Sequence, residues 1–90
     1  MSSVETQKDY DQETRDYEAF RRRQVASLTP GERQVARWVA RGLTNRAIAA
    51  RLGLTPNTVS KRVSEILDKL TLRSRQEIGP RLALYGGDIR

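Results

Sequence analysis

The sequence of 90 residues contains no cysteine and no histidine, and only five of its residues are aromatic. Without thiols or imidazoles, disulfides, cysteine nucleophiles and the common zinc and transition-metal sites are excluded. Carboxylates and lysines are then the main groups left for acid-base catalysis. We therefore expect that the protein is not an enzyme and uses no metal ion or cofactor.

Long apolar runs are also missing. No stretch approaches the roughly 18 consecutive apolar residues that cross a bilayer. The first 13 residues lack the basic and then apolar pattern of a signal peptide. We expect a cytoplasmic protein without membrane contact. A chain this short has room for one compact domain.

Charge is divided unevenly along the chain. Residues 1–20 hold six acidic and two basic residues, whereas residues 21–90 hold fifteen basic and five acidic residues. A dense positive charge suits a polyanion, because neutralised phosphates release counterions. Surface arginine also keeps proteins soluble, and a GC-rich genome alone would favour the fourteen arginines over three lysines. Composition is therefore consistent with nucleic-acid binding without requiring it.

The hydrophobic pattern predicts an all-α fold. Almost no stretch alternates with the period of two that strands show. We divide the chain into a flexible lead (residues 1–8), a charged helix (residues 9–26) and a folded domain (residues 28–85). Only the last segment has enough apolar residues for a core.

The first helix of the domain is marked by its caps. Thr29 and Glu32 are spaced as a capping box, and Pro30 lies at the first helical position. Gly42 is expected to end the helix. Its apolar side chains recur on one face and are interpreted as core residues, with the tryptophan as an anchor: Val35, Trp38 and Val39.

Two further helices are predicted close together. One occupies residues 45–52 after the cap Thr44, and the next begins after Thr55. The turn between them contains Gly53, which can end the first helix. Two helices joined by such a short turn form a helix-turn-helix, here residues 44–70, which is a common DNA-reading motif.

The third helix of the domain has two distinct faces. One is an apolar stripe that must face the core: Val59, Val63, Ile66, Leu67 and Leu70. The other is short or cationic, with no acidic residue before Glu65: Asn57, Ser60, Lys61 and Ser64. An ordinary solvated face usually mixes glutamate with lysine. We therefore predict that this face enters the major groove of DNA.

These features resemble the LuxR-type (GerE-type) helix-turn-helix domain of bacterial transcription regulators. The resemblance covers residues 28–78 and rests on several pieces in order: Leu28-Thr29 with Glu32, Gly42-Leu43-Thr44-Asn45, Ile48-Ala49, Thr58-Val59, Lys69-Leu70 and Arg73-Ser74-Arg75. It implies a four-helix domain, here preceded by an extra N-terminal helix. It also implies a transcription regulator that binds double-stranded DNA, with a fourth helix that commonly supports dimerisation on an inverted repeat. Because no receiver, ligand-binding or ATPase domain is attached in this sequence, we expect a stand-alone regulator.

The resemblance also implies roles for individual residues. Base contacts would come from Ser60, Lys61 and Ser64. Contacts to the DNA backbone, or to the scaffold that supports them, would come from Asn45, Arg46, Thr55, Asn57, Thr58, Arg62, Lys69 and Arg75. The chain departs from the family at four positions, which prevents transfer of an operator sequence: Ser60 replaces Lys, Arg62 replaces His, Gly31 replaces Arg and Thr71 replaces a frequent Gly.

Two alternatives remain open at this stage. The fourth region of sigma factors shares the motif and often has arginine at the place of Arg62; this would make RNA polymerase a partner. The continuation after Thr71, with Ser74 and Glu77 spaced as another capping box, favours the LuxR type. A protein-interaction adaptor could also keep the fold, because fold does not fix function. Its exposed face should then carry apolar or acidic residues.

The last helix contains a proline that should interrupt it. Pro80 lacks the amide that an α-helix interior needs, at a cost of about 3 kcal/mol. We predict that the helix kinks or splits near Gly79, and that Pro80 starts a last turn carrying Leu82 and Leu84 toward the next glycine. A short helix followed by a tail is the alternative.

The N-terminal helix carries a narrow stripe of three aromatic residues, Tyr10, Tyr17 and Phe20, which Gln24 continues on the same face. An isolated helix of this length is marginal in water, so the stripe should dock on something. The candidates are the chain's own core near Trp38, a second subunit, or another protein. We predict a homodimer in which this helix takes part, with its acidic residues away from the DNA.

Overall fold

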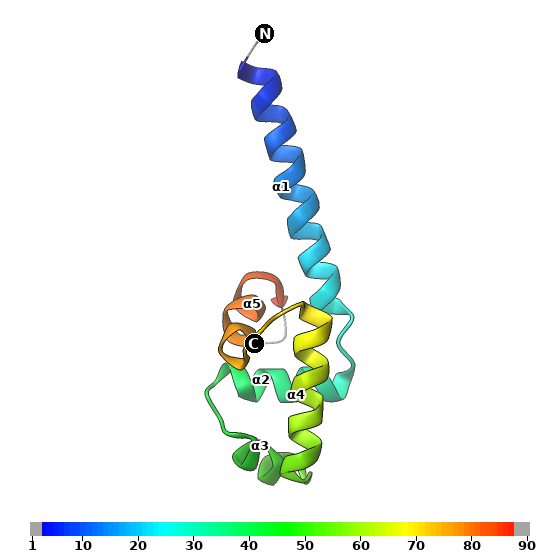
Figure 1. Cartoon of the computed structure of the whole chain (residues 1–90), viewed down its shortest axis with the longest axis vertical. Coiled ribbons are helices and arrows are strands. Elements are labelled where there is room, and N and C mark those ends of the chain that lie inside the picture. Colours follow the sequence, from blue (N-terminus) through cyan, green and yellow to red (C-terminus); the bar gives the residue numbers. More distant parts are fainter. Residues whose placement is uncertain (1–2, 88–90) are drawn as a thin grey trace.

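The computed structural model describes the backbone of residues 3–87 and the side chains of residues 10–87. Over this range the protein is all-helical, as predicted, with the four-helix domain preceded by an extra helix (Figure 1). The α-helices are α1 (Ser3–Ala26), α2 (Pro30–Ala40), α3 (Asn45–Leu52), α4 (Pro56–Leu70) and α5 (Ile78–Tyr85). A single 3-10 turn, Arg75–Glu77, precedes α5.

The predicted caps form where the sequence places them. The Thr29 hydroxyl accepts from the Glu32 N–H at 3.2 Å, and the Glu32 carboxylate accepts from the Thr29 N–H at 2.8 Å. Thr44 accepts from the Ala47 N–H at 3.1 Å. Each threonine satisfies an amide that the first turn would otherwise leave unpaired. The caps therefore fix where α2 and α3 begin.

The core joins all the helices of the domain. Its buried members come from every α-helix and from the connection between α1 and α2: Val25, Leu28, Val35, Ala36, Val39, Ile48, Ala49, Val59, Val63, Ile66, Leu70, Ile78 and Leu82. The apolar stripe predicted for α4 supplies four of them. Trp38, expected as the anchor of the core, is partly buried and packs against this cluster. Ala36 is a buried member of the core that the sequence analysis did not name.

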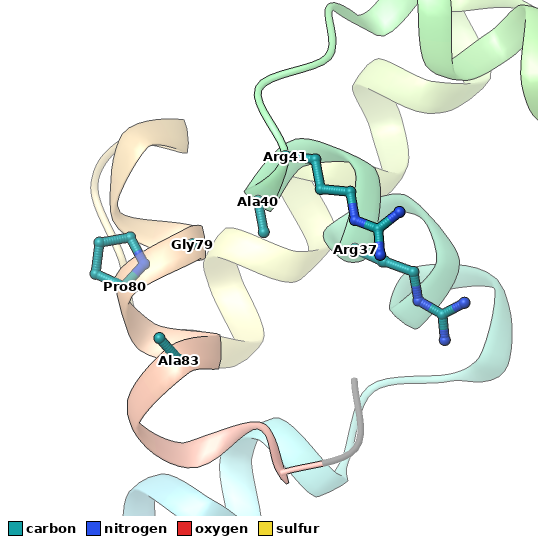
Figure 2. Close-up of a pocket in the computed structure, with 6 residues that line it drawn as sticks. All are labelled: Arg37, Ala40, Arg41, Gly79, Pro80 and Ala83. Carbon is teal, nitrogen blue, oxygen red and sulfur yellow. The ribbon is translucent and has the colours of Figure 1, made fainter. Parts of the chain in front are cut away.

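Small residues bring α5 against α2 (Figure 2). A Cβ built on Gly79 would lie 3.5 Å from the Cα of Ala40, which is ordinary van der Waals contact. The two helices leave a groove of about 430 Å³ beside this contact, with Arg37 of α2 and Arg41, which follows α2, on one side and Pro80 of α5 on the other. The groove lies between α2 and α5 and does not involve α4.

The last helical segment is divided into a 3-10 turn and an α-helix, as we predicted from the position of Pro80. The 3-10 turn ends at Glu77 and α5 starts at Ile78, so the change falls just before Gly79. Pro80 is the third residue of α5 and not its first, a place where the missing N–H would have had no partner in the helix. Leu82 is buried, whereas Leu84 is 71% exposed.

The extra helix is longer than predicted. It begins at Ser3, so residues 3–8 are helical backbone rather than a lead, and residues 1 and 2 lie outside the described part of the chain. Figure 1 shows α1 projecting away from the domain, at the end opposite to α3. The chain measures 60 × 20 × 20 Å because of this projection. Of the three candidates for docking the aromatic stripe, the chain's own core near Trp38 is ruled out, because Tyr10, Tyr17 and Phe20 are 65%, 51% and 48% exposed.

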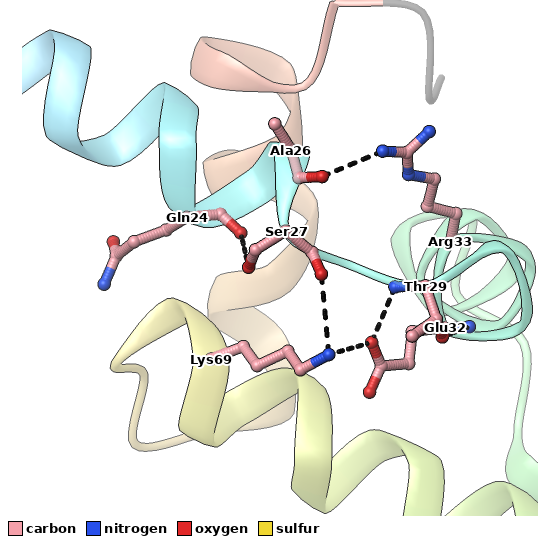
Figure 3. A network of polar contacts seen from close by, with 7 residues as sticks. All are labelled: Gln24, Ala26, Ser27, Thr29, Glu32, Arg33 and Lys69. Carbon is pink, nitrogen blue, oxygen red and sulfur yellow. Dashed lines mark hydrogen bonds and ion pairs between the residues drawn. The ribbon is translucent and has the colours of Figure 1, made fainter.

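Polar contacts fix the junction between α1 and the domain (Figure 3). Arg33 donates to the Ala26 carbonyl at 2.9 Å, and the Ser27 hydroxyl donates to the Gln24 carbonyl at 2.6 Å. Lys69 of α4 lies 2.8 Å from the Glu32 carboxylate and 3.5 Å from the Ser27 carbonyl. These bonds satisfy backbone groups at the end of α1 and hold the connection in place.

Candidate nucleic-acid interface

The candidate site is built on α3 and α4, which form the predicted helix-turn-helix. Gly53 ends α3 in the left-handed conformation with φ 67°, which glycine adopts without steric cost. Thr55 then caps α4 by accepting from the Thr58 N–H at 3.1 Å. Buried Ile48 of α3 and Val59 of α4 hold the two helices together. The turn therefore fixes the direction of α4.

The outer side of α4 is exposed and free of acidic residues in its first two turns. Ser60, Lys61 and Ser64, the predicted base contacts, are all exposed. The first turn of α4 contains no acidic residue. The exposed face thus carries small polar side chains and the positive charge of Lys61. It lies toward the N-terminal end of α4, where the helix dipole is also positive. Such a surface favours phosphate and base edges over cationic partners.

Residues at the start of α4 are already engaged in the cap. The hydroxyls of Thr55 and Thr58 lie 2.9 Å apart, and Thr58 is half-buried. Asn57 is exposed beside them. Of these three predicted backbone contacts, Asn57 has the side chain most available to a ligand. The two threonines hold the first turn in place.

Two predicted backbone contacts lie against each other instead of facing solvent. The Arg75 guanidinium donates to the Asn45 side-chain oxygen and to the Leu43 carbonyl. This links the 3-10 turn to the start of α3, two segments that are thirty residues apart. Arg46, next to Asn45, is exposed. The guanidinium of Arg46, unlike that of Arg75, therefore remains available to a phosphate.

Arg62 rests on the start of α2. A Cβ built on Gly31 would lie only 1.9 Å from Nη1 of Arg62, so the guanidinium occupies the space that any other residue at position 31 would fill. Arg62 is half-buried. The sequence showed both residues as departures from the family pattern, and the structure shows that they are in contact. Nothing local in the sequence connects α2 with α4 at this point.

Lys69 is part of the scaffold. Its ammonium lies 2.8 Å from the Glu32 carboxylate, and Glu32 is 3% exposed. Burial raises the pKa of Glu32, but the hydrogen bonds from Lys69 and from the Thr29 N–H outweigh it and hold the pKa below its ordinary value of 4.5. The structure thus supports the scaffold role of Lys69 rather than a contact with DNA.

Replacing Lys69 by methionine keeps its apolar stem and removes the ammonium. We expect the free energy of unfolding to fall by about 1–2 kcal/mol at pH 7, while the salt dependence of DNA binding stays unchanged. The pKa of Glu32 is lowered by folding, so its ionised form stabilises the protein above about pH 4.5. The difference between the two proteins should therefore vanish as the pH falls through this lowered pKa. Urea unfolding over a series of pH values from 7 downward measures it, and an unaltered stability at pH 7 would contradict the scaffold role.

Two more arginines form a basic cluster that the sequence analysis did not single out. The guanidinium carbons of Arg41 and Arg51 lie 5.2 and 4.7 Å from the centre of the Trp38 ring. At these distances each guanidinium is attracted to the face of the ring by a cation-π interaction. The spacing of Trp38 and Arg41 on one helix is visible in the sequence. The approach of Arg51 from α3 is not, because it depends on how α2 and α3 pack.

The class of protein follows from the match to known families. Residues 26–79 match the GerE model, described as bacterial regulatory proteins of the luxR family. This match covers more than half of the chain and includes α2, α3 and α4 in full. The chain belongs to the luxR family of bacterial regulatory proteins. The class is that of helix-turn-helix transcription regulators and not of enzymes.

Several curated regulators are similar to the same region. The nitrate/nitrite response regulator protein NarL of Escherichia coli K12 is 46% identical over 55 residues, which is 61% of this chain and 26% of NarL. The two-component response regulator PprB of Pseudomonas aeruginosa is 43% identical over 51 residues, 57% of this chain and 18% of PprB. The transcriptional regulatory protein UhpA of Escherichia coli K12 is 40% identical over 55 residues, 61% of this chain and 28% of UhpA.

The chain spans only about a quarter of the length of NarL and less than a fifth of the length of PprB. No solved structure matches it significantly. Within the described residues, no helix is long and apolar enough to span a membrane. The same residues contain no group of three or more carboxylates placed to hold a metal ion.

Proposed function

We propose that this chain binds double-stranded DNA in a sequence-specific manner, with α4 in the major groove, and regulates transcription as a homodimer on an inverted repeat. The observation that carries the proposal is the exposed, acid-free face of α4 formed by Ser60, Lys61 and Ser64. An α-helix fits the major groove, where each base pair presents a distinct pattern of donors and acceptors. Membership of the luxR family supports the same conclusion.

The proposal divides the predicted contacts into three groups. Lys61 and the two serines read bases. Arg46, Asn57 and Arg62 contact phosphates, which strengthens binding without reading sequence. The remaining residues act mainly as scaffold, because their side chains are engaged within the protein: Asn45, Thr55, Thr58, Lys69 and Arg75. Because we propose that the protein binds double-stranded DNA, we expect it at the bacterial nucleoid.

Replacing Arg62 by alanine should weaken binding to all DNA sequences alike. Removal of one phosphate contact lowers the slope of log affinity against log salt by about one unit. Gly31→Ala should act in the same direction, because its methyl group displaces the guanidinium of Arg62 from the place it now occupies. In the Arg62→Ala background, Gly31→Ala should have no further effect. Fluorescence anisotropy over a salt series measures this, and additive effects of the two substitutions would contradict it.

The function itself is tested by selecting bound sequences from a pool of randomised duplex DNA. We expect an enriched half-site that occurs twice in inverted orientation, bound without RNA polymerase. A protein like the fourth region of sigma factors would instead need polymerase and would select a single promoter element. An adaptor would enrich no sequence. Either of the last two results would overturn the proposal.

A further inference from the structure

A long stretch of the domain, residues 33–64, contains no acidic residue. Between Glu32 and Glu65 the chain holds seven cations and no carboxylate. Glu32 itself is buried in its ion pair with Lys69. Of the seven cations, only Lys61 and Arg62 belong to α4, and the other five lie on or next to α2 and α3. The surface of α2 and α3 is therefore positive in its own right.

Trp38 brings two of these cations together. The guanidinium carbons of Arg41, which follows α2, and of Arg51 on α3 lie 5.2 and 4.7 Å from the centre of its ring. Because both distances are to one point, the two carbons lie no more than about 10 Å apart, where like charges still repel each other. Among residues 10–87, neither guanidinium forms an ion pair with a carboxylate. A bound anion would relieve this repulsion.

The chemistry of this cluster, Trp38 with Arg41 and Arg51, suits phosphate. Both arginines are exposed, so their N–H groups can donate to a ligand in solvent. A guanidinium is planar and donates in pairs, which matches the oxygens of a phosphate group. The attraction of the ring holds each guanidinium in place. Less conformational freedom is then lost when the arginines bind, which favours affinity.

The cluster lies apart from the outer face of α4. The buried stripe of α4 faces the core that it shares with α2, whereas Ser60, Lys61 and Ser64 are exposed on the other side of the helix. α4 therefore stands between α2 and a duplex that occupies this outer face. Figure 2 shows Arg41 extending from the end of α2 away from Pro80. The cluster is thus available to phosphates other than those that α4 contacts.

We infer that Arg41 and Arg51, held on the ring of Trp38, form a second DNA-binding surface that contacts backbone phosphates and reads no sequence. The inference rests on the DNA binding of the proposed function and extends it to α2 and α3. The phosphates belong either to the same duplex, where it continues beyond the site read by α4, or to a second duplex. In both cases guanidinium N–H groups donate to phosphate oxygens. The surface adds affinity for DNA and leaves the choice of sequence to α4.

The fluorescence of Trp38 tests the surface directly, because it is the only tryptophan of the chain. The full chain is first saturated with its selected duplex, cut to the length of the half-sites. We expect a further, saturable change in emission in one of two titrations. A response to the selected duplex lengthened by about ten base pairs, one helical turn, on each side assigns the phosphates to the same duplex. A response only to an added duplex of unrelated sequence assigns them to a second one. No change in either titration would overturn the inference.

Two double variants of equal charge test the residues. Arg41→Gln with Arg51→Gln should abolish the response of Trp38 and weaken binding to the DNA that causes it about tenfold. The slope of log affinity against log salt should fall by about two units, one for each lost phosphate contact. Arg15→Gln with Arg22→Gln removes the same charge from α1 and should leave response and slope unchanged. Both arginines of the cluster are exposed, so circular dichroism should show a folded protein. Equal losses in the two double variants would overturn the inference.

The kind of partner and the proposed function are tested separately. Polyglutamate with the same number of charges as the duplex is the competing probe. If it changed the emission of Trp38 at the same concentration as the duplex, the cluster would be a surface for an acidic protein and the inference would be wrong. A response of Trp38 to DNA without any sequence preference of the chain would overturn the proposed function and support this surface. Sequence-specific binding without a response of Trp38 would do the reverse.

Discussion

Replacing Ile66 by alanine is expected to lower the free energy of unfolding by about 2–5 kcal/mol, because truncation of a fully buried side chain leaves a cavity. Ile66 is 0% exposed and lies in the middle of the α4 stripe. Small domains are marginally stable, so such a loss would leave a large fraction of the protein unfolded at 37 °C. DNA binding should fall with the folded fraction, since the same stripe orients the outer face of α4.

Urea unfolding followed by circular dichroism measures this loss. Leu84→Ala is the matched control, because the leucine is 71% exposed and its truncation should change stability by less than about 0.5 kcal/mol. Equal stabilities of the two variants would show that the stripe of α4 is not the centre of the core. A folded Ile66→Ala protein without DNA binding would point to a role of this residue beyond packing.

Replacing Lys61 by alanine should reduce the affinity for the selected sequence by about 1–3 kcal/mol, or roughly 5-fold to 150-fold. Lys61 is exposed at the second turn of α4, where a long cationic side chain can reach the acceptors of a guanine. Binding to unrelated DNA should fall much less, because only a non-specific charge is lost there. The ratio of specific to non-specific affinity is therefore the quantity that decreases.

Anisotropy titrations with the selected duplex and with a scrambled duplex at one salt concentration measure this ratio. Arg15→Ala is the control, because it removes the same charge from α1, at the end of the chain opposite to α3. It should leave the ratio unchanged. If Lys61→Ala lowered both affinities equally, Lys61 would be a phosphate contact and its assignment to base reading would be wrong.

The parts of the fold that could be predicted from the sequence are those encoded locally. Thr29, Thr44 and Thr55 each stand directly before an apolar pattern, and each caps a helix. The α4 stripe follows from a period of 3.6 residues and needs no knowledge of the other helices. The interruption before Pro80 follows from a missing amide. The exposed face of α4 was predictable for the same reason, as the complement of its buried stripe.

Contacts between distant segments could not be predicted. The pair of Lys69 and Glu32 joins residues 37 positions apart, and the contact of Arg62 with Gly31 depends on how α4 crosses α2. The sequence showed these residues as cations and as a departure from a family pattern, without their partners. The predicted contacts to the DNA backbone could therefore be sorted into scaffold and surface residues only when the packing was known.

The position of α1 was predicted only in part. The aromatic stripe correctly indicated a helix, but packing near Trp38, one of the candidates, would have required this helix to fold back onto the domain. The junction instead directs α1 outward, because Arg33 binds the Ala26 carbonyl and Gln24 binds Thr71. A pattern of residues on one helix does not contain the angle at which the chain leaves the next one. For this reason the aromatic stripe of α1 is exposed to solvent.

The central claim, that the outer face of α4 reads DNA, is tested most directly by amide chemical shifts in a titration of the labelled protein with its selected duplex. The account predicts that the largest changes lie at residues 55–64 of the α4 region and at the start of α3, with residues 10–20 of α1 unchanged. The largest changes on α1 or α5, with none on α4, would contradict it.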